Sequence, residues 1–248
     1  MFRSFVILTA LAVLLLMGAT VSAHAVDYWV SSDDAAVITN NDCGFISDVA
    51  GHPVIRRSFQ DESQPGVPAN VADRINSGDE LVVPAGSRLE WTTGSNIIVT
   101  LGSGTRVRLD GLRSFGSAPD ATAARLDVSV VTGAIRVQVR LNEERPDAFL
   151  ASLSGADILV RRGDVEMFSD NAWRGAVLSG EASARVRRGG VTGVPFMLGE
   201  GQSVGAGGQE PLEEAQRSAI RGRLPFSFEL VRAALPPLPP ISSILEAP

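Results

Sequence analysis

The residue types that could perform nucleophilic or metal chemistry are scarce in this sequence. Cys43 is the only cysteine, and His52 is the only histidine after residue 25. A cysteine nucleophile needs a neighbouring base, and that base needs a third group to orient it. Both residues lie in 43–57, "CGFISDVAGHPVIRR", where no third group is evident. We interpret them as neighbours in a β segment, and we predict no catalytic residue, metal ligand or cofactor.

The segment 102–106, "GSGTR", has the glycine content of a phosphate-binding loop. A P-loop also requires a lysine, and the chain contains none. A dinucleotide-binding loop requires a following helix, whereas "TRVRLD" continues with the alternation of a strand. The segment is therefore predicted to be a β-turn. Nucleic acid is not expected as a partner, because the formal net charge is −6.

Other candidate groups also have structural interpretations. "RRGD" at 161–164 contains an adhesive tripeptide but is predicted as two strands about a turn. Trp91 is in phase with Leu89 and is expected in the core, whereas Trp173 is a candidate for stacking on sugars. Paired carboxylates lie in polar contexts without the burial that general acid catalysis needs, so they are predicted to be solvated. These pairs are Asp33-Asp34, Asp61-Glu62, Glu143-Glu144 and Glu213-Glu214.

The elements that would position these residues are short β-strands. Apolar residues alternate with polar ones at 97–101, 105–109, 126–130 and 135–139, the period of half-buried strands. Glycines at 78, 86, 94 and 102 recur every eight residues, which we interpret as the turns between successive strands. The pattern predicts an all-β domain over 43–208. By itself it does not separate a sandwich, a barrel and a solenoid.

The two ends of the chain differ from this region. Residues 1–25 have one basic residue, an apolar run from Phe5 to Met17, and Ala23-His24-Ala25, the pattern of a secretory signal peptide. Because the apolar run is shorter than the roughly 20 residues of a membrane-spanning helix, we expect cleavage before Val26 and no membrane anchor. Export to a bacterial periplasm or exterior is therefore predicted.

After a linker at 26–42 and the β domain, short helices are predicted at 209–235. Leu212, Ala215 and Ile220 would form one apolar stripe, which ends at Gly222 and Pro225. A second short helix is predicted from Phe228. The last segment, 236–248, is "PPLPPISSILEAP" and is predicted to be an extended proline-rich tail.

In their order, the β segments resemble the FecR domain, a bacterial periplasmic β domain. The segment "GFISDVAGHPVIRR" (44–57) is similar to the family's G-x-V-x-x-V-x-G-x-V-x-x-R start. The family's central turn corresponds to Gly102-Ser103-Gly104-Thr105, with glycine or serine where the family often has Asp, and Asp164 replaces the usual Thr after Arg-Gly. The later segments that resemble the family are "VADRINSGDELVVPAGSRLEWTTGSNIIVTLGSGTRVRLDG" (71–111), "RLDVSVVTGAIRVQV" (125–139), "FLASLSGADILVRRGDVEMF" (149–168), "AVLSGEASARVRRGG" (176–190) and "MLGEGQSV" (197–204).

The resemblance implies a β-solenoid-like stack of short strands, with a β-sandwich as the alternative. FecR relays a signal from an outer-membrane receptor to a cytoplasmic sigma factor, but here only four residues precede the apolar run. The implied protein is therefore an exported, stand-alone, non-catalytic interaction module. Its expected partner is another envelope protein, bound by strand addition at an exposed edge. Glycan or peptidoglycan binding and a surface structural role are the alternatives.

Overall fold

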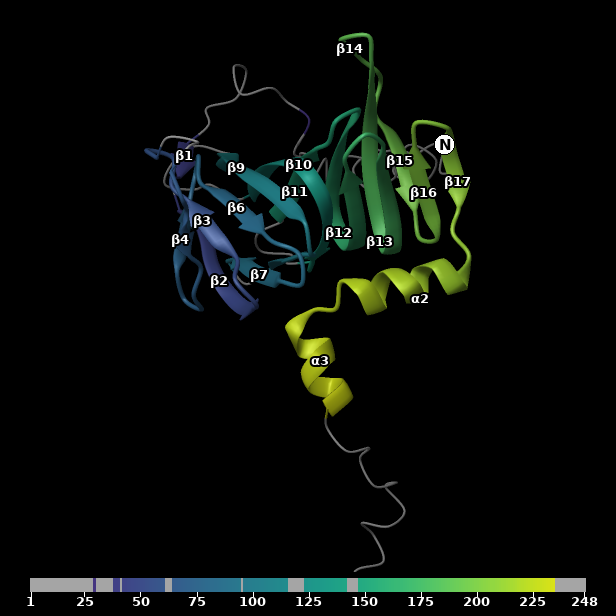
Figure 1. Cartoon of the computed structure of the whole chain (residues 1–248). Helices are drawn as coiled ribbons and strands as arrows, with labels where there is room; N and C mark the ends of the chain where they lie inside the picture. Colours follow the sequence, from purple (N-terminus) through teal and green to yellow (C-terminus); the bar gives the residue numbers. More distant parts are fainter. Residues whose placement is uncertain are drawn as a thin grey trace, which may run out of the picture.

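The structure is a computed structural model that describes Trp29 and residues 38–40, 42–60, 64–94, 96–115, 123–141 and 147–234 (Figure 1). The predicted signal peptide, most of the linker and the proline-rich tail lie outside the described residues. The pairs Asp33-Asp34, Asp61-Glu62 and Glu143-Glu144 also lie outside them. None of the helices in the described ranges has the length and apolar character needed to cross a membrane.

The described chain is an all-β domain followed by two short helices, which confirms the predicted fold class. The elements are β1 (Ile38–Asn40), β2 (Asp42–Ala50), β3 (Val54–Arg56), β4 (Val67–Pro68), β5 (Arg74–Asn76), β6 (Glu80–Val83), β7 (Arg88–Thr93), β8 (Ile97–Leu101), β9 (Thr105–Phe115), β10 (Ala123–Val139), β11 (Asp147–Ser152), β12 (Ala156–Ser169), β13 (Trp173–Arg188), β14 (Val191–Thr192), β15 (Phe196–Gly199), β16 (Gln202–Gly205), β17 (Gly208–Pro211), α2 (Glu214–Arg223) and α3 (Ser227–Ala234).

Short strands that follow one another in sequence line up as single passes across the molecule. β2 and β3 form one pass, which pairs with β7 and β6 of the next. That second pass pairs with β8 and β9, and these pair in turn with the two arms of the long strand β10. The long strands β12 and β13 are further passes, and β15 with β16 forms another. Each pass therefore contributes one arm to each of two half-sheets.

The first half-sheet contains β4, β3, β6, β9, β11 and β15 with the adjoining arms of the long strands, and the second contains β5, β2, β7, β8, β16 and β17 with the other arms. Their inward residues share one core cluster. Asn96 Nδ2, beside β8, donates a 3.0 Å hydrogen bond to Asp147 Oδ2 at the start of β11, so the half-sheets meet at their distal ends. The fold thus has the stacking of a solenoid-like arrangement and the two-layer core of a sandwich.

The sheet is mixed and open. β10 and β11 pair in parallel, whereas the other pairings of the described strands are antiparallel. β11 lies between β10 and β12 in the first half-sheet, and these two strands pair directly in the second. Within the described ranges, β4, β5, β15 and β17 each have one strand partner. These strands are the edges at which a further strand could be added.

Glycines with positive φ lie where the passes bend from one half-sheet into the other. A Cβ on Gly133 would lie 2.5 Å from the Cα of Thr105 in the neighbouring pass, and one on Gly180 would lie 2.6 Å from the Arg162 carbonyl oxygen. These positions allow neighbouring backbones to touch at the corner, which a side chain would prevent. The corner glycines are Gly51, Gly86, Gly104, Gly133, Gly163, Gly180 and Gly201.

The eight-residue glycine rhythm marks two kinds of position. Gly78 and Gly94 lie at chain reversals, between β5 and β6 and between β7 and β8. Gly86 and Gly102 lie in corners, where the chain bends but continues along the same pass. All four glycines lie between successive strands, as interpreted from the sequence. At Gly86 and Gly102, however, the chain bends without reversing its direction along the pass. Eight residues make one arm, and two arms make one pass.

The predicted strand alternation is confirmed in the core. Ile97, Val99 and Leu101 of β8 are at most 1% exposed, as are Val107 and Leu109 of β9. The apolar residues that alternate along both arms of β10 are also buried. Because their side chains point between the half-sheets, each pass buries its inward face against its neighbours and against the opposite layer.

α2 lies across the outer surface of the second half-sheet, and α3 follows it and projects away from the β domain (Figure 1). Leu212 and Ile220 pack on Ala176 and Leu178 of β13. Ala215 was predicted on the same stripe but is exposed. α2 begins only at Glu214, so Leu212 does not set its face, and Ala215 is five residues from Ile220, about 140° away around the helix.

We predict opposite effects from two glycine-to-alanine substitutions. Gly163→Ala places a side chain at φ +120° against the backbone carbonyl of Ser179, so it should destabilise the fold by at least about 1–3 kcal/mol. Gly222→Ala, in α2 with nothing within 4 Å, should be neutral or stabilise by up to about 1 kcal/mol. Denaturant unfolding of both variants measures the difference. Equal stability of Gly163→Ala and the parent protein would show that the corner tolerates a Cβ.

Candidate functional site

The structure separates Cys43 from His52. Cys43 is in the core, where burial, and secondarily the charge of Asp42, raises the pKa of its thiol to about 12. An activated cysteine needs the opposite shift. His52 is exposed in the corner after β2. It is nine residues from Cys43 along an extended strand, a separation of roughly 25–30 Å. These two residues therefore do not form a nucleophile and base.

The Arg-Gly-Asp tripeptide is not a turn, which corrects the prediction of two strands about a turn. β12 runs through it and bends at Gly163, so the chain continues in the same direction. Asp164 is 6% exposed, and its carboxylate binds the guanidinium of Arg136. The acidic group that an adhesive loop would present is therefore buried.

Both tryptophans discussed in the sequence analysis are buried. Trp91 is 0% exposed, which confirms its predicted place in the core. Trp173 is 9% exposed, because its indole packs closely over Gly155, where a Cβ would collide with the ring nitrogen. It lacks the open ring face on which a sugar could stack. The described residues also contain no group of three His, Cys, Asp or Glu side chains able to hold a metal ion.

A row of buried polar residues crosses the outer surface of the second half-sheet. Glu90, Thr100, Arg136 and Glu166 are register neighbours on β7, β8, β10 and β12, and each is at most 2% exposed. Their strand positions face away from the core, so something other than the sheet must cover them. The cover is the segment 212–229, which we call the C-terminal clamp.

Arg136 is the centre of this row. Its guanidinium donates to Asp164 Oδ1 and Oδ2 at 2.8 and 2.6 Å, and to Glu229 Oε2 and Oε1 at 2.8 and 2.9 Å. The fifth N–H donates to the carbonyl oxygen of Leu224 at 2.9 Å. All five donors are therefore used. The ring of Phe226 lies 4.3 Å from the guanidinium carbon, which adds a cation–π contact.

Two carboxylates on either side of Arg136 also bind the clamp. The backbone N–H and hydroxyl of Ser227 donate to Glu90 at 2.8 and 2.7 Å. Glu166 accepts a 3.2 Å hydrogen bond from Arg174 of β13 and a second one from Arg223, the last residue of α2. The clamp is thus attached to β7, β10 and β12 through charged groups.

The charges in this network stabilise one another. Burial by itself would raise the pKa of Glu229, but hydrogen bonds from Arg136 and from the Phe226 N–H outweigh it and hold that pKa below its ordinary value. Burial would likewise lower the pKa of Arg136, and its bonds to Asp164 and Glu229 raise it instead. Both groups therefore remain charged at neutral pH, as a buried ion pair with satisfied hydrogen bonds requires.

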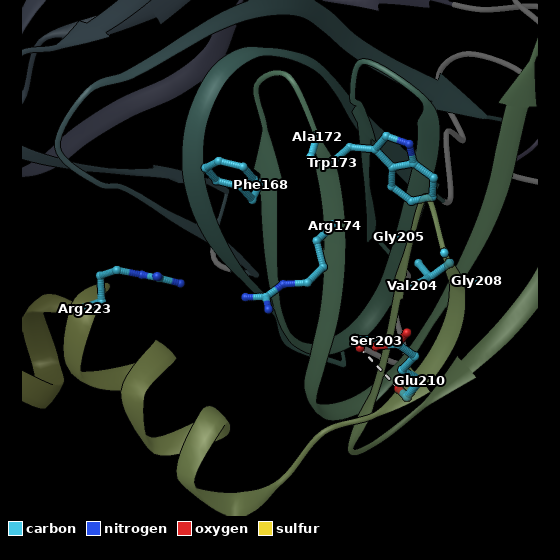
Figure 2. A pocket seen from close by; sticks show the side chains of 11 residues that line it. Phe168, Ala172, Trp173, Arg174, Ser203, Val204, Gly205, Gly208, Glu210 and Arg223 are labelled. Atoms are coloured by element: carbon cyan, nitrogen blue, oxygen red, sulfur yellow. Dashed lines mark hydrogen bonds between the residues drawn. The ribbon is translucent and has the colours of Figure 1, made fainter.

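A cavity of about 430 Å³ opens beside this network, between β12, β13, β16, β17 and the end of α2. Figure 2 shows the guanidinium groups of Arg174 and Arg223 pointing toward one another, with Phe168 nearby and Trp173 and Val204 on the opposite side. A smaller groove of about 290 Å³, lined by Arg56, Arg57, Arg106 and Arg108, lies on the first half-sheet. Its arginines pair with Glu80, Asp79 and Asp110.

The segment from β14 to β15 presents apolar side chains at a sheet edge. Val191 is 70% exposed, Val194 85% and Met197 54%. β15 pairs with β13 on one side, and β14 projects beyond its neighbours (Figure 1). An edge strand with exposed apolar residues and few charges is a template for pairing with another chain.

The sequence analysis did not identify the buried polar row. The alternation at 135–139 correctly indicates that Arg136 points away from the core, but a half-buried strand would leave its outer face in solvent, whereas Arg136 is 1% exposed. The groups that cover Arg136 are more than 85 residues away in sequence. The available signal was the apolar content of "LPFSFEL" (224–230), which exceeds what a solvated connector needs.

Comparison with known proteins adds a similarity of fold. No protein-family model and no curated protein sequence matches the chain. Two crystal structures of a candidate anti-sigma factor from Parabacteroides distasonis ATCC 8503 are similar, each at 15% sequence identity, with TM-scores of 0.42 and 0.41. The matches cover 57% and 56% of this chain and 63% and 62% of the other, so the chain matches less than two thirds of that protein. This similarity concerns the fold alone.

The clamp should lose stability at low pH. The folded-state pKa of Glu229 lies below its ordinary value of 4.5, so its stabilising effect is complete above that value and is lost as the pH falls through the folded pKa. The parent protein should therefore exceed Glu229→Gln in unfolding free energy at neutral pH, and the difference should shrink below pH 4.5. Chemical denaturation across this range measures it. The exposed-site control Glu210→Gln should show little difference from the parent, and a Glu229→Gln deficit that persists in acid would contradict the assignment.

Proposed function

We propose that the protein is an exported, non-catalytic interaction module of the FecR type, which binds another envelope protein by strand addition at β15. The observation that carries this proposal is the edge of β15, which among the described strands pairs with β13 alone, together with the exposed apolar residues at 191–197. The ordered FecR-like segments and the predicted signal peptide support the location. The burial of Cys43 and Asp164, and the exposure of His52 away from both, support a non-catalytic role.

The β15 edge suits strand addition for a physical reason. The inward residue Leu198 is 1% exposed and anchors the strand in the core, while the residue before it, Met197, is 54% exposed. An added strand would therefore gain backbone hydrogen bonds along β15 and apolar contact with Met197 and Val194. In contrast, the outer surface of the second half-sheet is covered by the clamp and offers no equivalent site.

The edge proposal predicts that added charge at the β15 edge reduces partner binding. Lysine on an edge strand opposes pairing, so Val194→Lys/Met197→Lys should lower the recovery of the envelope partner by about tenfold or more. Recovery by the tagged protein, after cross-linking in an envelope extract, is quantified by mass spectrometry. Val71→Lys, at an exposed apolar residue (60%) between β4 and β5, is the matched control and should bind as the parent does. Equal recovery by the edge variant, or no specific partner at all, would contradict the proposal.

The export proposal predicts a mature chain that begins at Val26. Small side chains at Ala23 and Ala25 are needed for signal-peptide cleavage. The intact mass of protein from the envelope fraction should correspond to residues 26–248, and Ala25→Leu should accumulate the uncleaved form. Val21→Leu, outside these two positions, is the control and should be processed normally. A parent protein that keeps residues 1–25 and stays in the cytoplasmic fraction would contradict export.

A further inference from the structure

The cavity beside α2 has the size and lining of a small-molecule site. Its volume of about 430 Å³ falls within the range of about 300–1,000 Å³ typical of ligand pockets. It lies in the second half-sheet, whereas the β15 edge belongs to the first. A ligand here would therefore occupy a site distinct from the proposed strand-addition edge.

One end of the cavity is cationic. Arg174 and Arg223 both bind Glu166, whose side chain is 1% exposed, so the two guanidinium groups are held in place from below. Their own side chains are 42% and 58% exposed. Each guanidinium has five donors and gives one to Glu166 in this arrangement, which leaves donors directed at the solvent-filled side. At this end of the cavity, two positive charges around Glu166 leave a local excess of one positive charge, and the carboxylate of Glu210 lies elsewhere in the lining, where it would disfavour a more highly charged anion.

Ser203 and Glu210 also line the cavity, and Figure 2 shows them away from Arg223. The remaining walls are apolar or consist of backbone. Phe168 and Val204 supply apolar surface, and the edge of Trp173 continues it. Gly205, Gly207 and Gly208 line the cavity without side chains, so the space beside the strands stays open. Figure 2 shows Phe168 beside the two arginines, and Trp173 and Val204 on the side away from Arg223. A ligand that fits must therefore combine an anionic group with an apolar body.

We propose that this cavity binds a small monocarboxylate with an apolar body. The carboxylate would accept hydrogen bonds from Arg174 and Arg223, as the carboxylate of Glu166 does from its own side. A singly charged group matches the local excess of one positive charge, whereas a phosphate dianion would exceed it. The apolar body would lie against Phe168 and Val204.

Ligand binding at this site would connect two elements. Arg174 belongs to β13, and Arg223 is the last residue of α2. A carboxylate between them would attach the helix to the sheet through a further pair of charge-assisted hydrogen bonds. Because such a ligand binds the folded protein only, it would raise the unfolding temperature in a concentration-dependent way.

The test uses the whole mature chain and four probes: N-acetyl-phenylalanine, N-acetyl-leucine, the neutral amide N-acetyl-phenylalaninamide, and phenyl phosphate. Titration calorimetry and NMR should show saturable binding of a carboxylate with a Kd of about 1 mM or tighter. The amide should bind at least about tenfold more weakly, and phenyl phosphate should not bind more tightly than the carboxylates. Absence of saturable binding by both carboxylates, or equal binding by the amide, would overturn the proposal. Tighter binding of phenyl phosphate would overturn the monocarboxylate assignment.

Three variants and one control identify the site. Arg174→Gln and Arg223→Gln should each weaken carboxylate binding by about tenfold or more, whereas Arg188→Gln, an exposed arginine on the other arm of β13, should not change it. Gly207→Phe fills the cavity without a positive φ and without altering the contacts of Glu166, so it should abolish binding while the fold remains intact. Normal binding by Gly207→Phe would show that the ligand lies elsewhere. Because Gly207→Phe leaves β15 unchanged, this variant should recover the envelope partner as the parent protein does. A failure of ligand binding can therefore be distinguished from a failure of the proposed strand addition.

Discussion

The fold depends on backbone contact along one corner. Each pass must bend there while its neighbours remain hydrogen-bonded on both sides, so adjacent backbones approach more closely than a Cβ permits. Gly163 and Gly180 show this constraint directly, since each occupies the space that a side chain on the other would need. At Gly133, Gly163 and Gly180, positive φ and the absence of a side chain are required together, whereas a Cβ on Gly86 or Gly104 would meet nothing within 4 Å and only the positive φ favours glycine there. Without this bend, each long strand would extend a single flat sheet, and no enclosed core would form.

The bend creates two outer surfaces, which differ in whether the C-terminal clamp covers them. On the second half-sheet, the buried row around Arg136 binds the C-terminal clamp, because a buried guanidinium without its carboxylate partners would be strongly destabilising. This surface is consequently closed. Among the described strands, the first half-sheet ends on one side at β15, which pairs with β13 alone and lies beside exposed apolar side chains. The position of the cavity follows from where the clamp lies, because Arg223 of α2 forms part of its lining.

The FecR-like segments correspond closely to structural requirements. The central turn of the resemblance, at Gly104, is the corner between β8 and β9, and its Arg-Gly position is the corner at Gly163. Residues that carry the resemblance are therefore those that the bend needs. This is why the pattern informs about architecture more than about the partner, which would contact edge and cavity residues outside those glycine positions. The functional proposals consequently rest on exposed groups such as Met197 and Arg174.

The sequence by itself determined the all-β class, the core alternation of β8, β9 and β10, and the approximate places of both helices, because strand period and glycine position are local properties. Only the tertiary structure decided which glycines reverse the chain and which bend it, since Gly78 and Gly86 look alike until their neighbours are known. It also decided that Arg136 is buried rather than solvated and that Arg174 and Arg223 meet at Glu166. These outcomes depend on a clamp that returns from a distant part of the chain, and local periodicity carries no information about such contacts.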